Sequence, residues 1–195
     1  MKKCFPENPL RKIEIYHDEF PVNPIKDFDL VFQFHLLGGN DFHFVSNEAE
    51  YPFDGNGVVK DGLFALPVYV YNHSGMVFSL NPFSCPWDSG LTGYIYVDKE
   101  KFCKDFQIEE FNPIKALQIA KSEVELLNQY VSGDIWGYKE WTRKDADIWT
   151  QWEEGDSCWG FFGKDGIEYA LKYIGAFDGK TQIDNGDCIA WKVFD

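Results

Sequence analysis

The 195-residue chain is 45% hydrophobic and 18% aromatic, which excludes a disordered polymer and provides for a substantial core. Its 32 acidic and 18 basic residues give a net charge of −14, which argues against direct binding to nucleic acid or to an anionic membrane. The five cysteines are widely spaced and form no CxxC pair, so neither a disulfide framework nor a metal or other cofactor is expected. With no apolar run of about 20 residues and no signal-peptide pattern, we expect a cytoplasmic protein.

The first half of the chain is predicted to consist mainly of strands. Apolar residues alternate over residues 11–17, and an apolar run follows at 28–37. After a polar loop, three segments rich in aromatic and β-branched residues are separated by glycine and proline, and they cover residues 66–72, 76–80 and 93–98. They are predicted to be adjacent antiparallel strands, with a tight hairpin at residues 73–75.

The second half combines helices with further strands. Residues 113–132 follow the N-cap Asn112, begin at Pro113 and stop before Gly133, with apolar residues recurring every three or four positions, so this is the clearest helix. Shorter helices are predicted at 99–106 and 167–174, and strands at 134–143, 148–152, 158–162 and 189–194. The pattern predicts a single α+β domain over residues 1–195, with a mostly antiparallel sheet and two or three helices packed on one face.

The stretch NHSGMVFSLNPFSCPWDSG, residues 72–90, concentrates groups that could carry chemistry. The candidate site residues within it are His73, Ser84, Cys85, Trp87 and Asp88. His73 could act as a base and Cys85 as a nucleophile, but no known nucleophile motif surrounds the thiol. Aspartate, serine and glycine are also the ordinary residues of turns, and a tryptophan can cover a corner. The structural interpretation as a tight corner is favoured.

A second stretch, DSCWG, repeats the same residue types near the end of the chain and adds Asp156, Cys158 and Trp159 to the candidate site. If the two stretches met in the fold, they would form a pocket with two thiols, two carboxylates, two indoles and an imidazole. Nothing in the spacing requires such a meeting, and a metal site is not expected.

The motifs PFSCPWDSG and DSCWGFFG, with IEIYHDEFPVNP, LPVYVYNHSG and EVELLNQYVSGDIWGY, resemble an uncharacterised family of small proteins encoded by bacteriophages, plasmids and other mobile elements. The resemblance covers most of the chain and implies a biological context but no reaction. The chain departs from the family pattern at Asn72, where aspartate is expected, and at Leu91-Thr92, where Gln-Val is commoner. Loss of an aspartate beside His73 weakens any mechanism in which that carboxylate orients the imidazole.

Two functions follow as hypotheses. The favoured one is a non-enzymatic, acidic accessory protein of a phage or mobile element that binds a basic host or defence protein, as an anti-defence inhibitor or DNA mimic would. The alternative is a small-molecule-binding protein, or a thiol-dependent hydrolase or transferase, with a pocket around His73, Cys85 and Cys158. Catalysis is left open but not favoured, and the sequence contains no indication of the oligomeric state.

Overall fold

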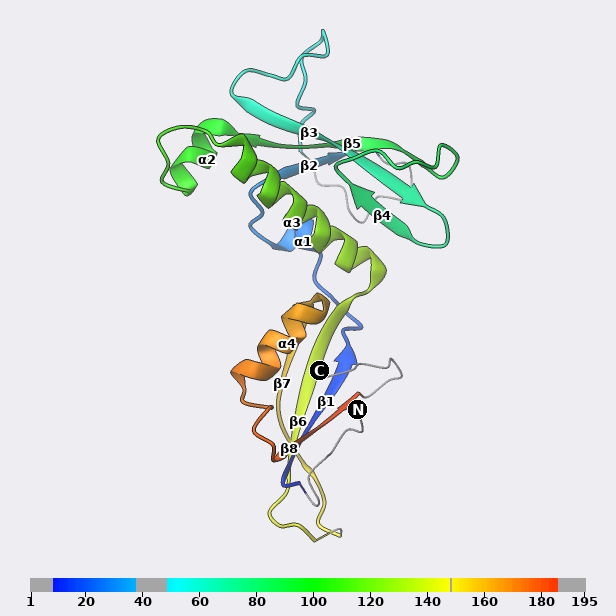
Figure 1. Ribbon diagram of the computed structural model, residues 1–195, viewed down its shortest axis with the longest axis vertical. Helices are drawn as coiled ribbons and strands as arrows, with labels where there is room; N and C mark the ends of the chain where they lie inside the picture. Colours follow the sequence, from blue (N-terminus) through cyan, green and yellow to red (C-terminus); the bar gives the residue numbers. More distant parts are fainter. Residues whose placement is uncertain (1–8, 38–48, 148, 186–195) are drawn as a thin grey trace. The chain divides into compact units, whose positions relative to one another are not determined.

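The computed structural model describes residues 9–37, 49–147 and 149–185 (Figure 1). The chain divides into two compact units. Unit 2 is the continuous segment Val22–Ser132, and unit 1 combines the residues up to Pro21 with those from Gly133 onwards. Each unit has its own sheet, so the predicted α+β class is confirmed and its strands are divided between two sheets. That both units belong to one domain stays a prediction.

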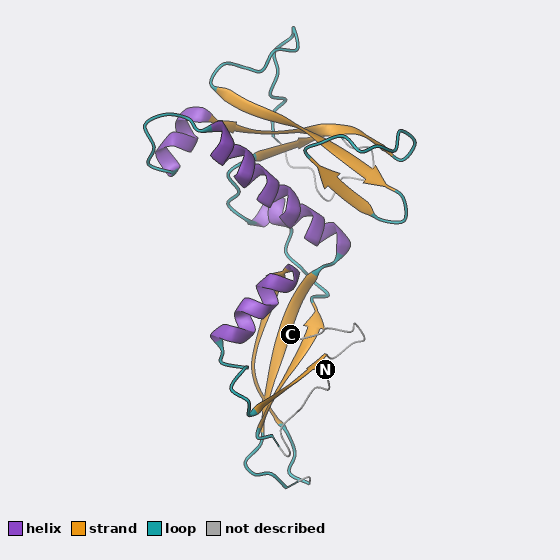
Figure 2. Cartoon of the chain, in the orientation of Figure 1, coloured by secondary structure: helices purple, strands orange, loops and turns teal. Residues whose placement is uncertain are grey.

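Unit 2 is built on a four-stranded antiparallel sheet with the order β2-β5-β3-β4. Its strands are β2 (Gln33–Leu36), β3 (Leu63–Asn72), β4 (Met76–Ser79) and β5 (Ser89–Asp98). Its helices are α1 (Pro24–Asp27), α2 (Lys99–Asp105) and α3 (Pro113–Ser132). Helix α3 runs along one face of the sheet (Figure 2), and all three helices contribute side chains to the core on that face.

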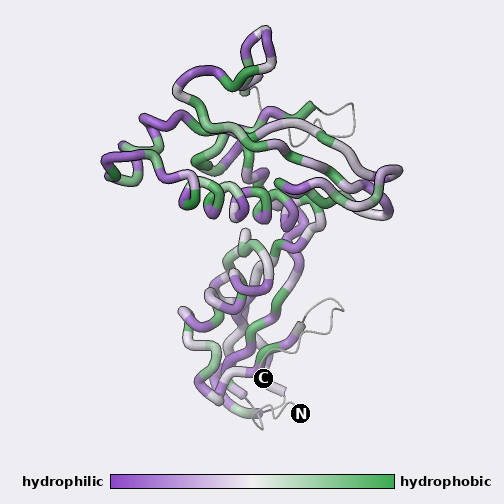
Figure 3. The backbone as a smooth tube through the Cα atoms, turned by 45° about the horizontal axis from the view of Figure 1, so that its top comes forward, coloured by the Kyte–Doolittle hydropathy of each residue, from purple (hydrophilic) through white to green (hydrophobic). Residues whose placement is uncertain are grey.

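Helix α3 has the predicted bounds because its capping residues act as expected. The Asn112 side chain accepts hydrogen bonds from the amides of Ile114 and Lys115, both at 3.0 Å. Gly133 ends the helix with φ of +72°, a conformation that favours glycine. Hydrophobic and hydrophilic positions alternate along the helix (Figure 3), and its apolar side packs on the sheet through Ala120, Leu127 and their neighbours.

Unit 1 is a mixed sheet with the order β7-β6-β1-β8, covered on one face by helix α4 (Gly163–Tyr173). Its strands are β1 (Arg11–His17), β6 (Ile135–Thr142), β7 (Glu153–Phe162) and β8 (Thr181–Asn185). Among these described strands, β1 and β8 pair in parallel and the other neighbours pair antiparallel. Fully buried Ile13, Ile167 and Leu171 lie in the core between the sheet and α4.

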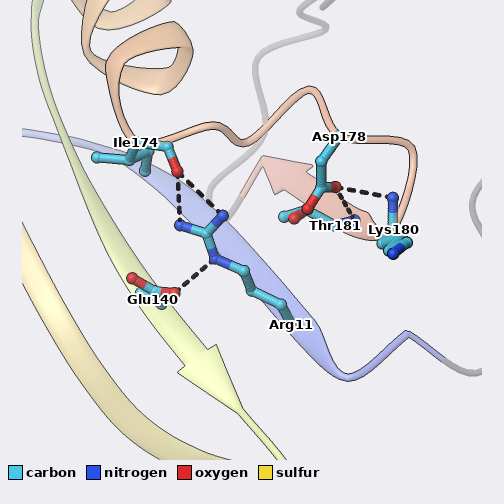
Figure 4. Close-up of polar contacts among 6 residues, drawn as sticks. All are labelled: Arg11, Glu140, Ile174, Asp178, Lys180 and Thr181. Atoms are coloured by element: carbon cyan, nitrogen blue, oxygen red, sulfur yellow. Dashed lines mark hydrogen bonds and ion pairs between the residues drawn. The ribbon is translucent and has the colours of Figure 1, made fainter.

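Arg11 links three elements of unit 1 (Figure 4). Its guanidinium donates from Nε to the carboxylate of Glu140 on β6 at 2.5 Å, and from both terminal nitrogens to the carbonyl of Ile174 at 3.1 Å. Ile174 is the C-cap of α4, where a cation is favourable because the last helical carbonyls carry partial negative charge. The Arg11 side chain therefore connects strand β1 both to β6 and to the C-terminal end of α4.

The predictions from sequence did not include α1 or β8, and two of the predicted strands were misplaced. The run predicted at 28–37 is a strand only over Gln33–Leu36, and the residues described within 148–152 form no strand. The predicted strand at 189–194 lies outside the described residues. Within the part of the chain that the structure describes, no helix is long and apolar enough to cross a membrane.

Candidate functional site

The corner between β4 and β5 brings together the first group of candidate residues. The Asp88 carboxylate lies between two other side chains, with Oδ2 3.3 Å from Nδ1 of His73 and 3.6 Å from Sγ of Cys85, which donates to it. His73 comes from the hairpin after β3, whereas Cys85 and Asp88 come from the loop before β5. Side chains from the β3–β4 hairpin and from the loop between β4 and β5 therefore meet at one carboxylate.

Hydrogen bonds to backbone carbonyls hold this corner in place. The amide of Asn72 donates to the carbonyl of Asp88 at 2.8 Å, and the hydroxyl of Ser89 donates to the carbonyl of Cys85. The hairpin itself turns at Ser74, whose φ is +60°, and closes with a hydrogen bond from the His73 amide to the Gly75 carbonyl. The predicted turn roles of these residues are thus visible in the structure.

The polar contacts of the corner do not resemble an activated nucleophile. In reactive cysteine sites a cation or an imidazole stabilises the thiolate, whereas the contact of the Cys85 thiol is a hydrogen bond that it donates to the carboxylate of Asp88. The imidazole of His73 contacts that same carboxylate. Asp88, and not residue 72, therefore supplies the carboxylate beside the imidazole, and this arrangement orders a turn.

Trp87 is strongly exposed. Its side chain is 90% exposed, so it does not cover the corner as the sequence suggested. Ser84 is also exposed, whereas Phe83 is half-buried and its ring lies 5.7 Å from that of Tyr71. Sequence reasoning did not include Tyr71 or Phe83 in the site, although the alternation of tyrosines in LPVYVYN places Tyr71 on the same side of β3 as Tyr69. A fixed loop thus presents an indole to solvent.

The second group of candidate residues lies on β7 of unit 1. Asp156 and Cys158 are exposed there, and Cys158 pairs with Tyr138 on β6. Burial raises the pKa of the Tyr138 hydroxyl, and the neighbouring Cys158, Glu140 and Asp156 raise it further. The two Cys-Trp stretches consequently belong to different units, and neither unit by itself contains the joint pocket considered above.

Trp159 packs against the backbone of β6, where Gly137 leaves room for its ring. A Cβ added at Gly137 would overlap the indole of Trp159. We expect Gly137→Ala to destabilise the chain by about 1–2 kcal/mol, because the ring must move off the sheet. Urea denaturation checks this value. Gly90→Ala is the control, since an added Cβ there meets nothing within 4 Å, and it should change stability by less than about 0.5 kcal/mol. Equal effects of both substitutions would contradict the prediction.

The segment that forms the unit 2 corner contains acidic residues but no lysine or arginine. Between Lys60 and Lys99 the chain contains no lysine or arginine, but it contains Asp61, Asp88 and Asp98. Among the described residues, no group of three histidine, cysteine or acidic side chains could hold a metal ion. The corner therefore offers an exposed indole and a carboxylate in a segment without lysine or arginine.

Comparisons of the chain with protein-family models, with curated proteins and with solved structures found no match.

Proposed function

We propose that this protein acts by binding a basic partner protein and that the corner around Trp87 is part of the contact. The observation that carries the proposal is the 90% exposure of Trp87 on a loop held by the Asp88 and Ser89 hydrogen bonds. Tryptophan is among the residues that most often dominate the energy of protein interfaces. A loop that is already ordered loses little conformational freedom on binding, so more of the contact energy becomes affinity.

The charge supports a basic partner. Unit 2 contains 15 acidic and 7 basic residues, and unit 1 contains 17 and 11, so both units are negative. A field of this sign raises the rate at which a positively charged partner associates, and salt weakens it. Residues 61–98, which include the corner, contain three aspartates and no lysine or arginine, so no such cation opposes the acidic charge of the whole chain there.

The resemblance to proteins encoded by phages and other mobile elements supports a more specific form of the proposal. In that context, the partner is a host or defence protein in the cytoplasm, and the chain is an anti-defence inhibitor. A basic surface that normally holds DNA is one that an acidic protein can occupy as a DNA mimic. This function requires no cofactor and no catalytic residue of the chain.

The proposal predicts that Trp87→Ala strongly reduces capture of the partner. Tagged wild-type chain is incubated with bacterial host lysate at low and at high salt, and the bound proteins are identified by mass spectrometry. We expect a basic protein that is bound at low salt and released at high salt. Trp87→Ala should capture it at least about tenfold less well, since truncating a tryptophan hot spot costs about 2 kcal/mol or more.

Trp149→Ala is the matched control for this experiment. Trp149 is 84% exposed but lies in unit 1, in the loop before β7, so its removal changes exposed aromatic surface without touching the corner. It should capture the same protein as the wild type. If Trp87→Ala and the wild type capture the same proteins to the same extent, the corner is not a contact and the proposal fails.

A further inference from the structure

The face of the unit 2 sheet opposite α3 carries an unusual number of tyrosines. Val68, Val70 and Phe78 point into the core, so their strand neighbours point to the other face. The strand pairing places Tyr71 directly opposite Val77, and Tyr69 opposite Leu91. We call this outer surface the tyrosine face, and its members are Tyr51, Tyr69, Tyr71, Val77, Leu91 and Tyr94.

One side of the tyrosine face is covered by the chain itself. The segment before β3 crosses the β2–β5 side, where the ring of Tyr51 lies 5.3 Å from His35 and 5.9 Å from Tyr94, and Phe53 lies 4.5 Å from Tyr94. The face is more open around β3, where Val77 on β4 and Leu91 on β5 are 44% and 47% exposed. The half-buried Tyr69 and Tyr71 lie in the strand between these two residues.

The tyrosine face continues into the corner described above. Tyr71 contacts Phe83 at 5.7 Å and the imidazole of His73 at 6.3 Å between ring centroids. Two exposed aliphatic side chains and a row of tyrosines therefore adjoin the loop that carries the exposed Trp87. Such a concentration of apolar and aromatic surface is characteristic of a contact site.

The composition of this face indicates what it binds. Residues 61–98 supply all of its members except Tyr51 and contain no lysine or arginine. At the edge near Tyr51, the ammonium of Lys60 lies 3.4 Å from the carboxylate of Glu50, so that positive charge is paired. Burial and the nearby Tyr51 raise the pKa of Tyr94, which leaves its phenol neutral. Neutral aromatic rings attract cations, and guanidinium stacks on them better than ammonium because it is planar and less strongly hydrated.

We propose that the tyrosine face binds arginine side chains of the basic partner, in a contact that includes the Trp87 corner. This inference rests on the proposed function for the existence of a basic partner and adds the surface and the side chain that it recognises. The exposed Val77 lies opposite Tyr71 and gives direct access to the face, since its side chain can be replaced without disturbing the core.

The test places a charge of either sign at position 77. A fluorescein-labelled peptide of nine arginines is titrated with the whole chain, and binding is measured by fluorescence anisotropy. We expect Val77→Lys to weaken binding by about tenfold or more, because the new ammonium repels the guanidinium groups. Val77→Glu should bind at least as tightly as the wild type, and a nine-lysine peptide should bind more weakly than the arginine peptide to the wild type.

Ile114→Lys separates recognition by this face from the attraction of a −14 chain for any cation. Ile114 is 71% exposed in the first turn of α3, which covers the opposite face of the sheet, and its substitution gives the same net charge as Val77→Lys. It should weaken binding by less than about twofold. Thermal unfolding of all three variants establishes that each is folded.

Two results would overturn the inference. If Val77→Lys and Ile114→Lys weaken binding equally, net charge alone attracts the peptide; if the two peptides bind the wild type equally, arginine is not distinguished. Either result leaves the proposed function standing when Trp87 is still needed to capture a partner from lysate. A chain that captures no partner and binds neither peptide fails on both counts.

Discussion

Replacing Glu123 with alanine is expected to destabilise unit 2 by about 2–4 kcal/mol, because two backbone amides lose their acceptor. Glu123 is 6% exposed on α3, and its two carboxylate oxygens accept from the amides of Val31 at 2.6 Å and Phe32 at 3.0 Å. Those amides lead into β2. Hydrogen exchange of residues 31–36 should therefore accelerate in the variant, and urea denaturation of the whole chain gives the loss of stability.

Glu125→Ala is the control for this substitution. Glu125 lies on the same helix and is exposed, so its replacement should change stability by less than about 0.5 kcal/mol. If Glu123→Ala is as stable as Glu125→Ala, and exchange at residues 31–36 is unchanged, the two amide contacts do not contribute to the fold.

Glu123 also makes a pH-dependent contribution with a defined sign. Burial raises its pKa above the ordinary 4.5, although the bonds from Val31 and Phe32 act in the opposite direction. The folded state therefore holds the Glu123 proton more tightly than the unfolded state does. The contribution of Glu123 to the free energy of unfolding is therefore fully present below pH 4.5, and it decreases as the pH rises through the raised pKa. Compared with wild type, Glu123→Gln should thus show a deficit in stability that shrinks as the pH rises through this window.

Asn128→Ala is expected to cost about 2–3 kcal/mol and to expose the edge of the unit 2 sheet. The side chain of Asn128 on α3 binds both backbone groups of Phe78 on the edge strand β4. Its Oδ1 accepts from the Phe78 amide at 2.7 Å, and its Nδ2 donates to the Phe78 carbonyl at 3.0 Å. The amide of Asn128 thus takes the place that a further strand would occupy.

Two measurements check this prediction. Urea denaturation reports the stability, and size-exclusion chromatography reports association through the uncovered edge, which should increase in Asn128→Ala. Gln118→Ala is the control, because Gln118 is an exposed side chain of the same helix. A variant at position 128 that remains as stable and as monodisperse as this control would contradict the role assigned to Asn128.

The elements that the sequence predicted well are those whose signals are local. Helix α3 has the predicted bounds because Asn112, Pro113 and Gly133 act on the residues next to them. The hairpin at residues 73–75 and the turn roles of the candidate corner are equally local. The sequence also predicted the α+β class, since alternation and helical periodicity are properties of short windows.

The misplaced strands depend on contacts and on exposure that a short window of sequence does not contain. Residues 28–32 are apolar enough for a strand, but the amides of Val31 and Phe32 are bound by a carboxylate about ninety positions later in the chain. The predicted strand at 148–152 depended on aromatic residues, yet Trp149 is 84% exposed and its amide donates to Asp147 in a turn. Strand β8 has a weak signal of its own and is formed by pairing with β1.

The candidate site divides in the same way. The sequence alone identified the stretch around His73, Cys85, Trp87 and Asp88, because chemically active residues are concentrated there. Only the tertiary structure decided that Asp88 contacts both other polar side chains and that Trp87 is exposed. It also assigned Asp156, Cys158 and Trp159 to the other unit. The physical reason is that capping, turn geometry and periodicity act between neighbours in the chain, whereas exposure and contact depend on which distant segments the sheet brings together.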